Sequence, residues 1–270
     1  MTSRLTGHAG QVVLAASLFV FSFGCVSDPL DHAEELIAAY DFKSALAVLD
    51  QMTGAEREDM RFVRLHAVSL FVEGNIDEGF AELDSIRSDD PASQLAAARA
   101  LYEAAVVIIR EKNRIREAIT LLDSCRTWDP DLKQKVQSLV WNRALEYFSV
   151  PGDGGYQLIQ FASRLDEGIV RRLRSFNRLY YNRYNEMRGV YQALNLLKNR
   201  VELFRNNNQR LPVNYRELGQ GGFTAGVAVP KGWKIELSRE GKDRCILTAE
   251  ARKNNLGKVL PGSILKEYVP

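Results

Sequence analysis

Apolar residues in the first half of the chain recur at helical spacing within three segments that share one pattern. The segments align without gaps, and each has a small residue, a leucine four positions later and then an aspartate. The small residue and the leucine therefore lie on one face of a helix. Successive segments are offset by 34 and 39 residues, and a period of this length indicates stacked helical hairpins. The segments are Asp41–Met52 with Ala45, Leu49 and Asp50, Asn75–Ile86 with Gly79, Leu83 and Asp84, and Arg114–Cys125 with Ala118, Leu122 and Asp123.

The small residue has a physical reason. Two helices approach closely only where a side chain without bulk lies at their crossing, so we expect Ala45, Gly79 and Ala118 at equivalent contacts. One hairpin cannot bury its apolar stripe alone, and such units therefore stack on one another. An unrelated helical bundle with a chance similarity is the alternative.

The pattern beyond these segments predicts further helices and then strands. Near the C-terminus, Trp233, Ile235 and Leu237 alternate with polar residues, and Cys245 and Leu247 follow a glycine-containing turn. This alternation predicts a β-hairpin. The further predicted helices cover Leu132–Phe148, Tyr156–Gly168, about Ile169–Asn185, and Tyr191–Phe204.

The run from Val12 to Gly24 contains 13 residues without a charge. A membrane-spanning helix needs about 20 apolar residues, whereas this length suits the apolar core of a secretory signal. A longer anchor that begins near Leu5 is the alternative.

Ser22–Cys25, at the end of this run, resembles the lipobox of bacterial lipoproteins. The resemblance implies that residues 1–24 are a signal peptide and that Cys25 is acylated, which holds the protein to a membrane. In that family Val26 after the cysteine implies the outer membrane, facing the periplasm. The alternative is an ordinary buried Cys25.

The spacing of the three segments resembles the tetratricopeptide repeat, a 34-residue pair of helices. In the middle unit Ala67 and Gly79 match the small positions, and Gly74 matches the turn. In the third unit Val106 stands at a small position and Asn113 at the turn. The resemblance implies a solenoid whose first helices line a concave partner-binding face, at Arg64, Val68, Phe71, Glu103, Val107 and Arg110.

Tyr191–Phe204 and the Asn-rich stretch Arg205–Leu218 precede the predicted hairpin. This order resembles the globular part of type II secretion pseudopilins and type IV pilins, without their apolar N-terminal helix. The resemblance implies a pilin-like α+β module over residues 189–270, after a repeat domain over 25–188. A small α+β cap that seals the last repeat is the alternative. The expected fold is thus a mostly α, tetratricopeptide-like α-solenoid followed by a small α+β module.

Composition adds a charge asymmetry to this picture. The chain is 46% apolar and 26% charged with a net charge of +2, as in ordinary globular proteins. Residues 28–90 contain 16 acidic and 5 basic side chains, whereas residues 167–205 contain 9 basic and 3 acidic ones. Such polarity indicates two faces with different partners, or two halves that attract each other.

Arg171–Arg188 interleaves basic and aromatic residues. Such a segment can bind nucleic acid, but outside the cytoplasm an acidic protein surface or an anionic lipid is the more plausible partner. The alternative is that the arginines form a solvated face and that the apolar residues, Phe176, Leu179, Tyr180 and Tyr184, are core.

Candidate chemistry is sparse. His32 and His66 are each isolated, and no metal-ligand spacing is apparent. We expect Gly152–Gly155 to form a turn rather than a phosphate or calcium loop. We expect Cys125 and Cys245 to be buried thiols rather than a disulfide. We therefore expect no metal and no cofactor.

These observations favour a non-enzymatic, membrane-anchored envelope lipoprotein that acts as a protein–protein interaction scaffold. The pilin-like segment points to secretion-system or type IV pilus assembly, with other envelope proteins as partners and no nucleic acid. Two alternatives stay open, which are a component of outer-membrane β-barrel assembly and a cell-wall enzyme. The oligomeric state is not determined.

Overall fold

The computed structural model describes residues 28–86, 90–241, 244–252 and 264–269. The predicted signal peptide and Cys25 lie outside these residues. The elements are α1 (Pro29–Ala38), α2 (Phe42–Leu49), α3 (Met60–Glu73), α4 (Ile76–Ile86), α5 (Pro91–Val107), α6 (Ile115–Trp128), α7 (Lys133–Tyr147), α8 (Gly154–Leu165), α9 (Ile169–Phe176), α10 (Arg178–Asn208), α11 (Tyr215–Gln220), β1 (Trp233–Glu240), β2 (Arg244–Ala251) and β3 (Ile264–Val269).

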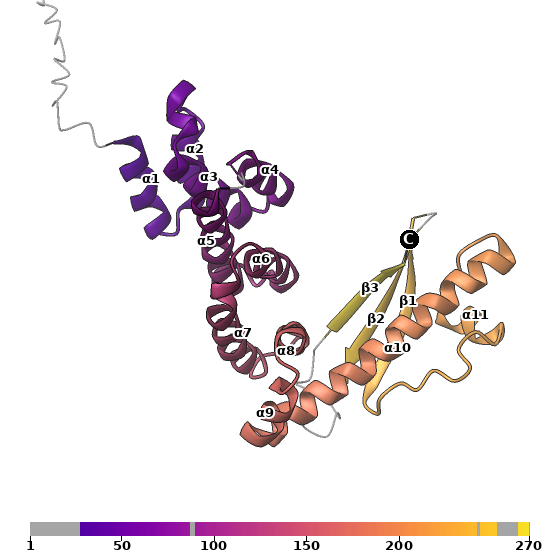
Figure 1. The fold of residues 1–270 in the computed structure, drawn as a ribbon. Coiled ribbons are helices and arrows are strands. Elements are labelled where there is room, and N and C mark those ends of the chain that lie inside the picture. The colour runs from indigo at the N-terminus through magenta and orange to yellow at the C-terminus, as the bar shows by residue number, and fades with distance from the viewer. Residues whose placement is uncertain (1–27, 87–89, 242–243, 253–263, 270) are drawn as a thin grey trace, which may run out of the picture.

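The elements form two arms that meet at an elbow (Figure 1). In the first arm, consecutive helices pair as α1 with α2, α3 with α4, α5 with α6 and α7 with α8. The second arm contains α10, α11 and the three strands, and α9 lies at the elbow between the arms. The prediction of a mostly α chain that ends in a small α+β module is confirmed.

Aspartate side chains cap the N-termini of several helices in the first arm. Asp28 and Asp41 accept hydrogen bonds from the backbone N–H groups of Leu30 and Ser44, at 3.0 and 3.1 Å. Asp90 accepts one from the N–H of Ser93 at 3.0 Å. These bonds satisfy donors that the first turn of a helix leaves without a partner. Part of the acidic composition of residues 28–90 therefore caps helices.

The small residues of the repeat are buried in the first arm. Ala45 and Ala118 have no exposed surface, and Gly79 is buried on α4. A Cβ atom added to Gly79 would lie 2.6 Å from the ring of Phe71 on α3. At this position only glycine permits the distance between α3 and α4 that the structure shows.

The repeat is also visible in the backbone of the turns. Tyr40, Gly74 and Asn113 lie between the two helices of successive hairpins and have φ values of 61°, 101° and 52°. Glycine adopts such left-handed conformations without steric cost, and asparagine does so more readily than other residues. Asn113 therefore serves as the turn residue of the third hairpin.

The third hairpin departs from the sequence alignment at Val106. A π-helical turn over Ile108–Lys112 separates α5 from Asn113. Such a turn takes in more residues than an α-helical one, so counting back from Asn113 at α-helical spacing gives the wrong position. Ala104 and Ala105 have no exposed surface, and Val106 is half-buried.

The helix predicted over about residues 169–185 is interrupted. α9 ends at Phe176, and Asn177 caps a new helix, α10, by accepting hydrogen bonds from the N–H groups of Leu179 and Tyr180. α10 continues for 31 residues and includes the predicted helix 191–204.

Two hydrophobic cores meet within α10. Tyr184 belongs to the core of the first arm, whereas Met187 and Val190 belong to the second core. The predicted domain boundary between residues 188 and 189 therefore falls in the interior of a helix. Because a long helix curves only gently, α10 fixes the position of the second arm relative to the first.

The sheet is an antiparallel meander in the order β1-β2-β3. Trp233 lies opposite Ala251, Leu237 opposite Leu247, and Cys245 opposite Val269. The buried face of the sheet shares a core with Val190, Leu194, Leu197, Val201 and Phe204 of α10. The predicted hairpin is present as β1 and β2, but β3 was not predicted.

Cys125 and Cys245 are free and buried, in the first and second core respectively. Burial raises the pKa of Cys125 to about 12 and also raises the pKa of Cys245. The prediction of buried thiols is confirmed.

The stretch Pro91–Glu111 is long and apolar enough to cross a membrane, but half of it is buried. Ala97, Leu101 and Ile108 of this stretch have no exposed surface and belong to the core of the first arm.

Candidate binding groove at the elbow

Two of the residues predicted for a concave binding face are buried. Val68 is 3% exposed and Phe71 is 0% exposed, because α3 is packed against α1, α2, α4 and α5. Phe71 packs against Phe80, with ring centroids 5.1 Å apart. The prediction that Val68 and Phe71 contact a partner is therefore wrong in this structure.

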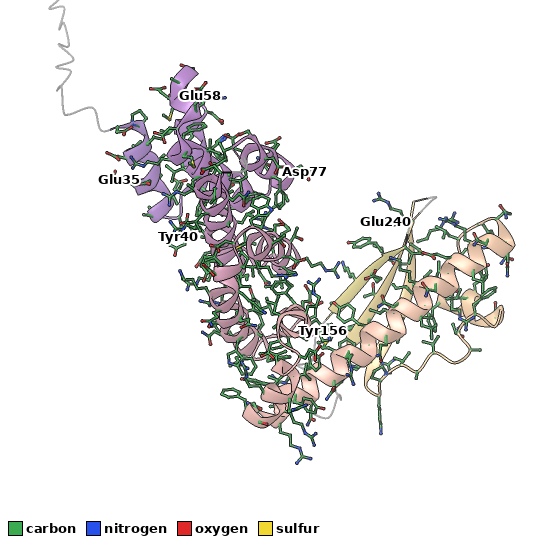
Figure 2. The ribbon with its side chains drawn as sticks, in the orientation of Figure 1. Glu35, Tyr40, Glu58, Asp77, Tyr156 and Glu240 are labelled. Atoms are coloured by element: carbon green, nitrogen blue, oxygen red, sulfur yellow. The ribbon has the colours of Figure 1, made fainter. Side chains whose placement is uncertain are left out.

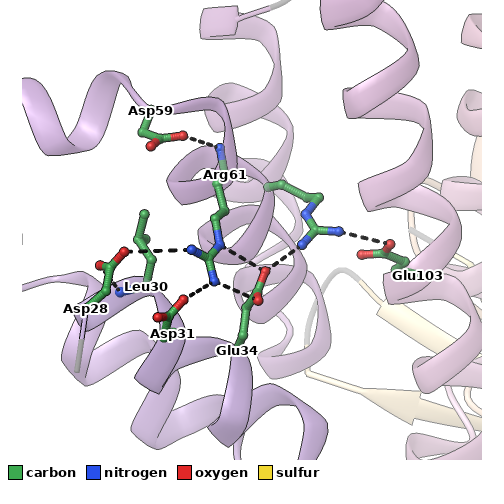
Figure 3. A network of polar contacts seen from close by, with 8 residues as sticks. Asp28, Leu30, Asp31, Glu34, Asp59, Arg61 and Glu103 are labelled. Atoms are coloured by element: carbon green, nitrogen blue, oxygen red, sulfur yellow. Dashed lines mark hydrogen bonds and ion pairs between the residues drawn. The ribbon is translucent and has the colours of Figure 1, made fainter.

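Two other predicted residues, Arg64 and Glu103, contact each other across α3 and α5. Their side chains are 3.4 Å apart, and Arg64 also lies 2.9 Å from Glu34 on α1. Arg61 contacts Glu34 at 2.7 Å and Asp31 at 2.6 Å. We name these five residues, Asp31, Glu34, Arg61, Arg64 and Glu103, the charged seam. Figure 3 labels all of them except Arg64.

Pairing holds the seam in its charged form. The hydrogen bond from Arg61 lowers the pKa of Glu34, and the bonds to Glu34 and Asp31 raise the pKa of Arg61. Because these charges already satisfy one another, the seam joins three helices and leaves little free charge for a partner. The last two predicted residues, Val107 and Arg110, are half-buried and exposed respectively.

A different surface offers more for recognition. Two adjoining hollows of about 320 and 400 Å³ share Arg116 and Gln157. The larger one, which we name the elbow groove, lies between α6, α8 and α10. Its lining residues are Arg116, Ile119, Tyr156, Gln157, Gln160, Phe161, Arg164 and Tyr191.

Stacked tyrosines form one wall of the elbow groove. Tyr156 stacks on Tyr191 with ring centroids 4.8 Å apart, and it packs against Tyr184 at 5.5 Å. Tyr184 and Tyr191 are seven residues apart on α10, so they share a helix face. Figure 2 places Tyr156 at the elbow, between α8 and the sheet. Tyr156 packs against both cores.

Burial moves the pKa values of these tyrosines further above physiological pH. It raises the pKa of Tyr156 to about 12 and also raises those of Tyr184 and Tyr191. The charge of Asp153 adds to the effect at Tyr191, whose hydroxyl donates a hydrogen bond to Asp153. The tyrosine wall is therefore a neutral, hydrogen-bonded surface.

Arginines border this wall on three helices. Arg116, Arg164 and Arg188 are exposed and come from α6, α8 and α10. The Arg164 guanidinium lies 5.2 Å from the ring centre of Phe161, and Arg188 influences the pKa of both Tyr156 and Tyr184. Within the described part of the chain, neither Arg116 nor Arg164 forms a salt bridge. The border therefore carries positive charge available to a ligand.

The glycines of the Gly152–Gly155 turn have a packing role. A Cβ atom on Gly154 would lie 2.9 Å from the ring of Tyr147, and one on Gly155 would lie 2.9 Å from the ring of Phe148. The glycines let the start of α8 pass close to the end of α7, which positions Tyr156 and Gln157 at the groove.

His66 also has defined neighbours. Its Nε2 lies 3.3 Å from Asp50 and its Nδ1 3.4 Å from Glu82, and its ring stacks on Phe62. Burial lowers the pKa of His66, but the Glu82 and Asp50 carboxylates outweigh burial and the pKa is raised. His32 is half exposed and lies 3.9 Å from Glu35.

The basic-aromatic segment 171–188 divides into two parts. Tyr184 is buried and Tyr180 half-buried, but Phe176 is 61% exposed and Leu179 is 43% exposed. The alternative that all four apolar residues are core is therefore wrong for Phe176 and Leu179.

Sequence reasoning missed the elbow groove because its residues come from three elements. Arg116 and Tyr191 are 75 positions apart, and no local pattern links them. The available signal was the seven-residue spacing of Tyr184 and Tyr191 in an arginine-rich helix.

No protein-family model, curated protein or solved structure matches this chain.

Proposed function

We propose that the protein is an exported, lipid-anchored scaffold that binds an acidic, extended segment of another envelope protein in the elbow groove. The observation that carries this proposal is the placement of the exposed Arg116 and Arg164 beside a tyrosine-lined hollow. Among the described residues neither arginine forms a salt bridge, and Arg116 hydrogen-bonds to the neutral Tyr191. The sequence of Ser22–Cys25 supports the anchor.

The chemistry of the groove suits a peptide. Aromatic side chains contribute contact area at low cost in conformational entropy. The Nε2 groups of Gln157 and Gln160 donate to Asp153 and to the Tyr184 hydroxyl. Their amide oxygens can accept hydrogen bonds from the backbone N–H groups of an extended segment. Guanidinium groups form strong, bidentate hydrogen bonds with carboxylates. An acidic segment therefore satisfies each type of side chain at the groove.

The lining of the elbow groove favours binding over acid–base catalysis. Its eight lining residues include no carboxylate, and the pKa values of its tyrosines are raised rather than lowered. A scaffold in secretion-system or pilus assembly is the role that the sequence favours.

The test is photo-crosslinking in living cells from an unnatural amino acid at Ile119, which lines the groove. The double variant Arg116→Gln with Arg164→Gln removes two charge-assisted contacts, each contributing about 1.5 kcal/mol or more. We expect crosslinks to segments rich in Asp and Glu, and at least a tenfold loss in the double variant. The control is Arg99→Gln with Arg252→Gln, which changes the net charge equally at exposed positions elsewhere.

Mass spectrometry of the crosslinked segments decides between the roles. Secretion or pilus components support the assembly role, and β-barrel assembly components support the alternative one. Crosslinks that the double variant leaves unchanged, or recovery of cell-wall fragments alone, would refute the proposed binding site.

A further inference from the structure

The outer side of the elbow carries a second surface that the groove does not use. α9 buries Ile169 and Leu173 and leaves its remaining positions largely exposed. Phe176 at its end and Leu179 at the start of α10 are the exposed apolar residues. These two residues and the exposed arginines around them form a surface that we name the outer elbow patch. Its arginines are Arg171, Arg172, Arg174 and Arg178.

Contacts with neighbouring helices fix the patch in place. The Phe176 ring meets Trp141 of α7 edge-on, with centroids 5.7 Å apart. The Arg172 guanidinium lies 5.9 Å from the Trp141 ring centre, and that of Arg174 lies 5.6 Å from the Tyr181 ring centre. Phe176 is thus held at the surface by a packed aromatic neighbour, although its own ring stays largely exposed.

The charges of the patch are mostly unpaired. Arg172 pairs with Asp166 at 2.9 Å. Among the described residues, Arg171, Arg174 and Arg178 form no salt bridge. Three free positive charges therefore surround two apolar side chains within nine residues of sequence.

We propose that the outer elbow patch docks on the surface of an anionic lipid bilayer. Phe and Leu enter the boundary between headgroups and acyl chains, and the arginines contact lipid phosphates. α9 lies at the outside of the bend between the arms (Figure 1), and a projecting patch of this size fits a flat surface.

The patch is independent of the proposed lipid anchor and of the elbow groove. α1, which follows Cys25 in sequence, lies at the far end of the first arm from α9 (Figure 1). A contact at α9 together with an anchor at Cys25 holds the first arm at both ends.

The test is binding of the full chain to vesicles, measured by sedimentation. One set contains about 30% phosphatidylglycerol in phosphatidylcholine and the other phosphatidylcholine alone. A basic residue near an anionic surface contributes about 1 kcal/mol, so Arg171→Gln, Arg174→Gln and Arg178→Gln together should weaken binding to anionic vesicles about 100-fold. The control with the same charge change is Arg99→Gln, Arg110→Gln and Arg252→Gln.

Phe176→Ser with Leu179→Ser should weaken binding with no change in net charge.

Hydrogen exchange with and without vesicles locates the contact on the chain, separately from any contribution of the N-terminal run. We expect anionic vesicles to slow exchange at residues 169–181. Equal binding by the arginine variant and its control, or slowed exchange confined to other segments, would overturn the proposal. So would retention of an acidic protein or a nucleic acid through the patch without vesicle binding. The groove variant Arg116→Gln with Arg164→Gln leaves the patch intact. Loss of partner crosslinking in that variant is therefore distinguishable from loss of vesicle binding in the patch variants.

Discussion

Gly79 sets the distance between α3 and α4 through the absence of a side chain. The Phe71 ring occupies the space where a Cβ atom would lie, and this ring is itself fully buried against Phe80. The ring therefore has no free direction in which to move. Ala45 and Ala118, at the corresponding positions of the other two hairpins, are likewise fully buried.

Gly79→Ala should destabilise the protein by about 1–2 kcal/mol. Overpacking of this kind destabilises a protein by about 1–3 kcal/mol. The better helix propensity of alanine offsets up to about 1 kcal/mol of this loss. Urea unfolding followed by circular dichroism measures the change.

Glu78→Ala is the matched control, because Glu78 is the exposed neighbour on the same helix, and it should change stability by less than about 0.5 kcal/mol. In a background of Phe71→Leu the effect of Gly79→Ala should shrink. An equal effect in both backgrounds would show that the ring is not the cause.

At the scale of elements, the first two hairpins are joined by ion pairs as well as by the core. His66 on α3 lies between Asp50, at the end of α2, and Glu82 on α4. The charged seam connects α1, α3 and α5 through Glu34, Arg64 and Glu103. Partly exposed pairs of this kind contribute about 1 kcal/mol or less each, so burial of the apolar faces dominates the stacking.

The ion pairs of His66 should make stability depend on pH. Because its folded pKa is raised, the stabilisation is fully present below the unfolded pKa of about 6.5 and is lost as pH rises through the folded pKa. We expect unfolding free energy to fall by about 1 kcal/mol between about pH 6 and pH 9. Urea titrations at both values measure it.

His66→Gln should remove this part of the pH dependence, since glutamine does not titrate. His32→Gln is the control, because His32 is half exposed. A pH profile that is the same for the wild type and His66→Gln would contradict the assignment.

At the scale of the whole molecule, α10 joins the two cores as one continuous helix. Tyr184 and Met187 are less than one turn apart and belong to different cores. The elbow groove lies where these cores meet, and Tyr156 contacts both. The position of the second arm therefore determines the shape of the proposed binding site.

The anchor is the other feature of the whole molecule. Cys25→Ser should release the protein to the soluble periplasmic fraction after a high-salt wash, which removes contacts made by exposed arginines. Incorporation of labelled palmitate should also cease, since Cys125 and Cys245 are buried. Ser27→Ala should keep both the label and the membrane location. A Cys25→Ser protein that still incorporates labelled palmitate would rule out Cys25 as the anchor.

The sequence by itself determined the features that depend on near neighbours along the chain. Helical spacing predicted the hairpins, the small residues at 45, 79 and 118 and the buried thiols. It could do so because residues three or four positions apart decide which face of a helix is apolar. Alternation predicted β1 and β2 for the same reason. The break at Asn177 was missed, because side-chain capping competes there with a continuous apolar pattern. The merging of the helices predicted over about 169–185 and 191–204 into α10 was missed as well.

The tertiary structure alone decided which surfaces are free. Phe71 and Phe176 are both phenylalanines on helices, yet the first is fully buried on a helix that contacts four others, whereas the second is 61% exposed at the elbow. β3 and the elbow groove likewise depend on elements far apart in sequence. Burial and convergence are properties of how elements pack, and packing is settled by long-range contacts that no short stretch of residues contains.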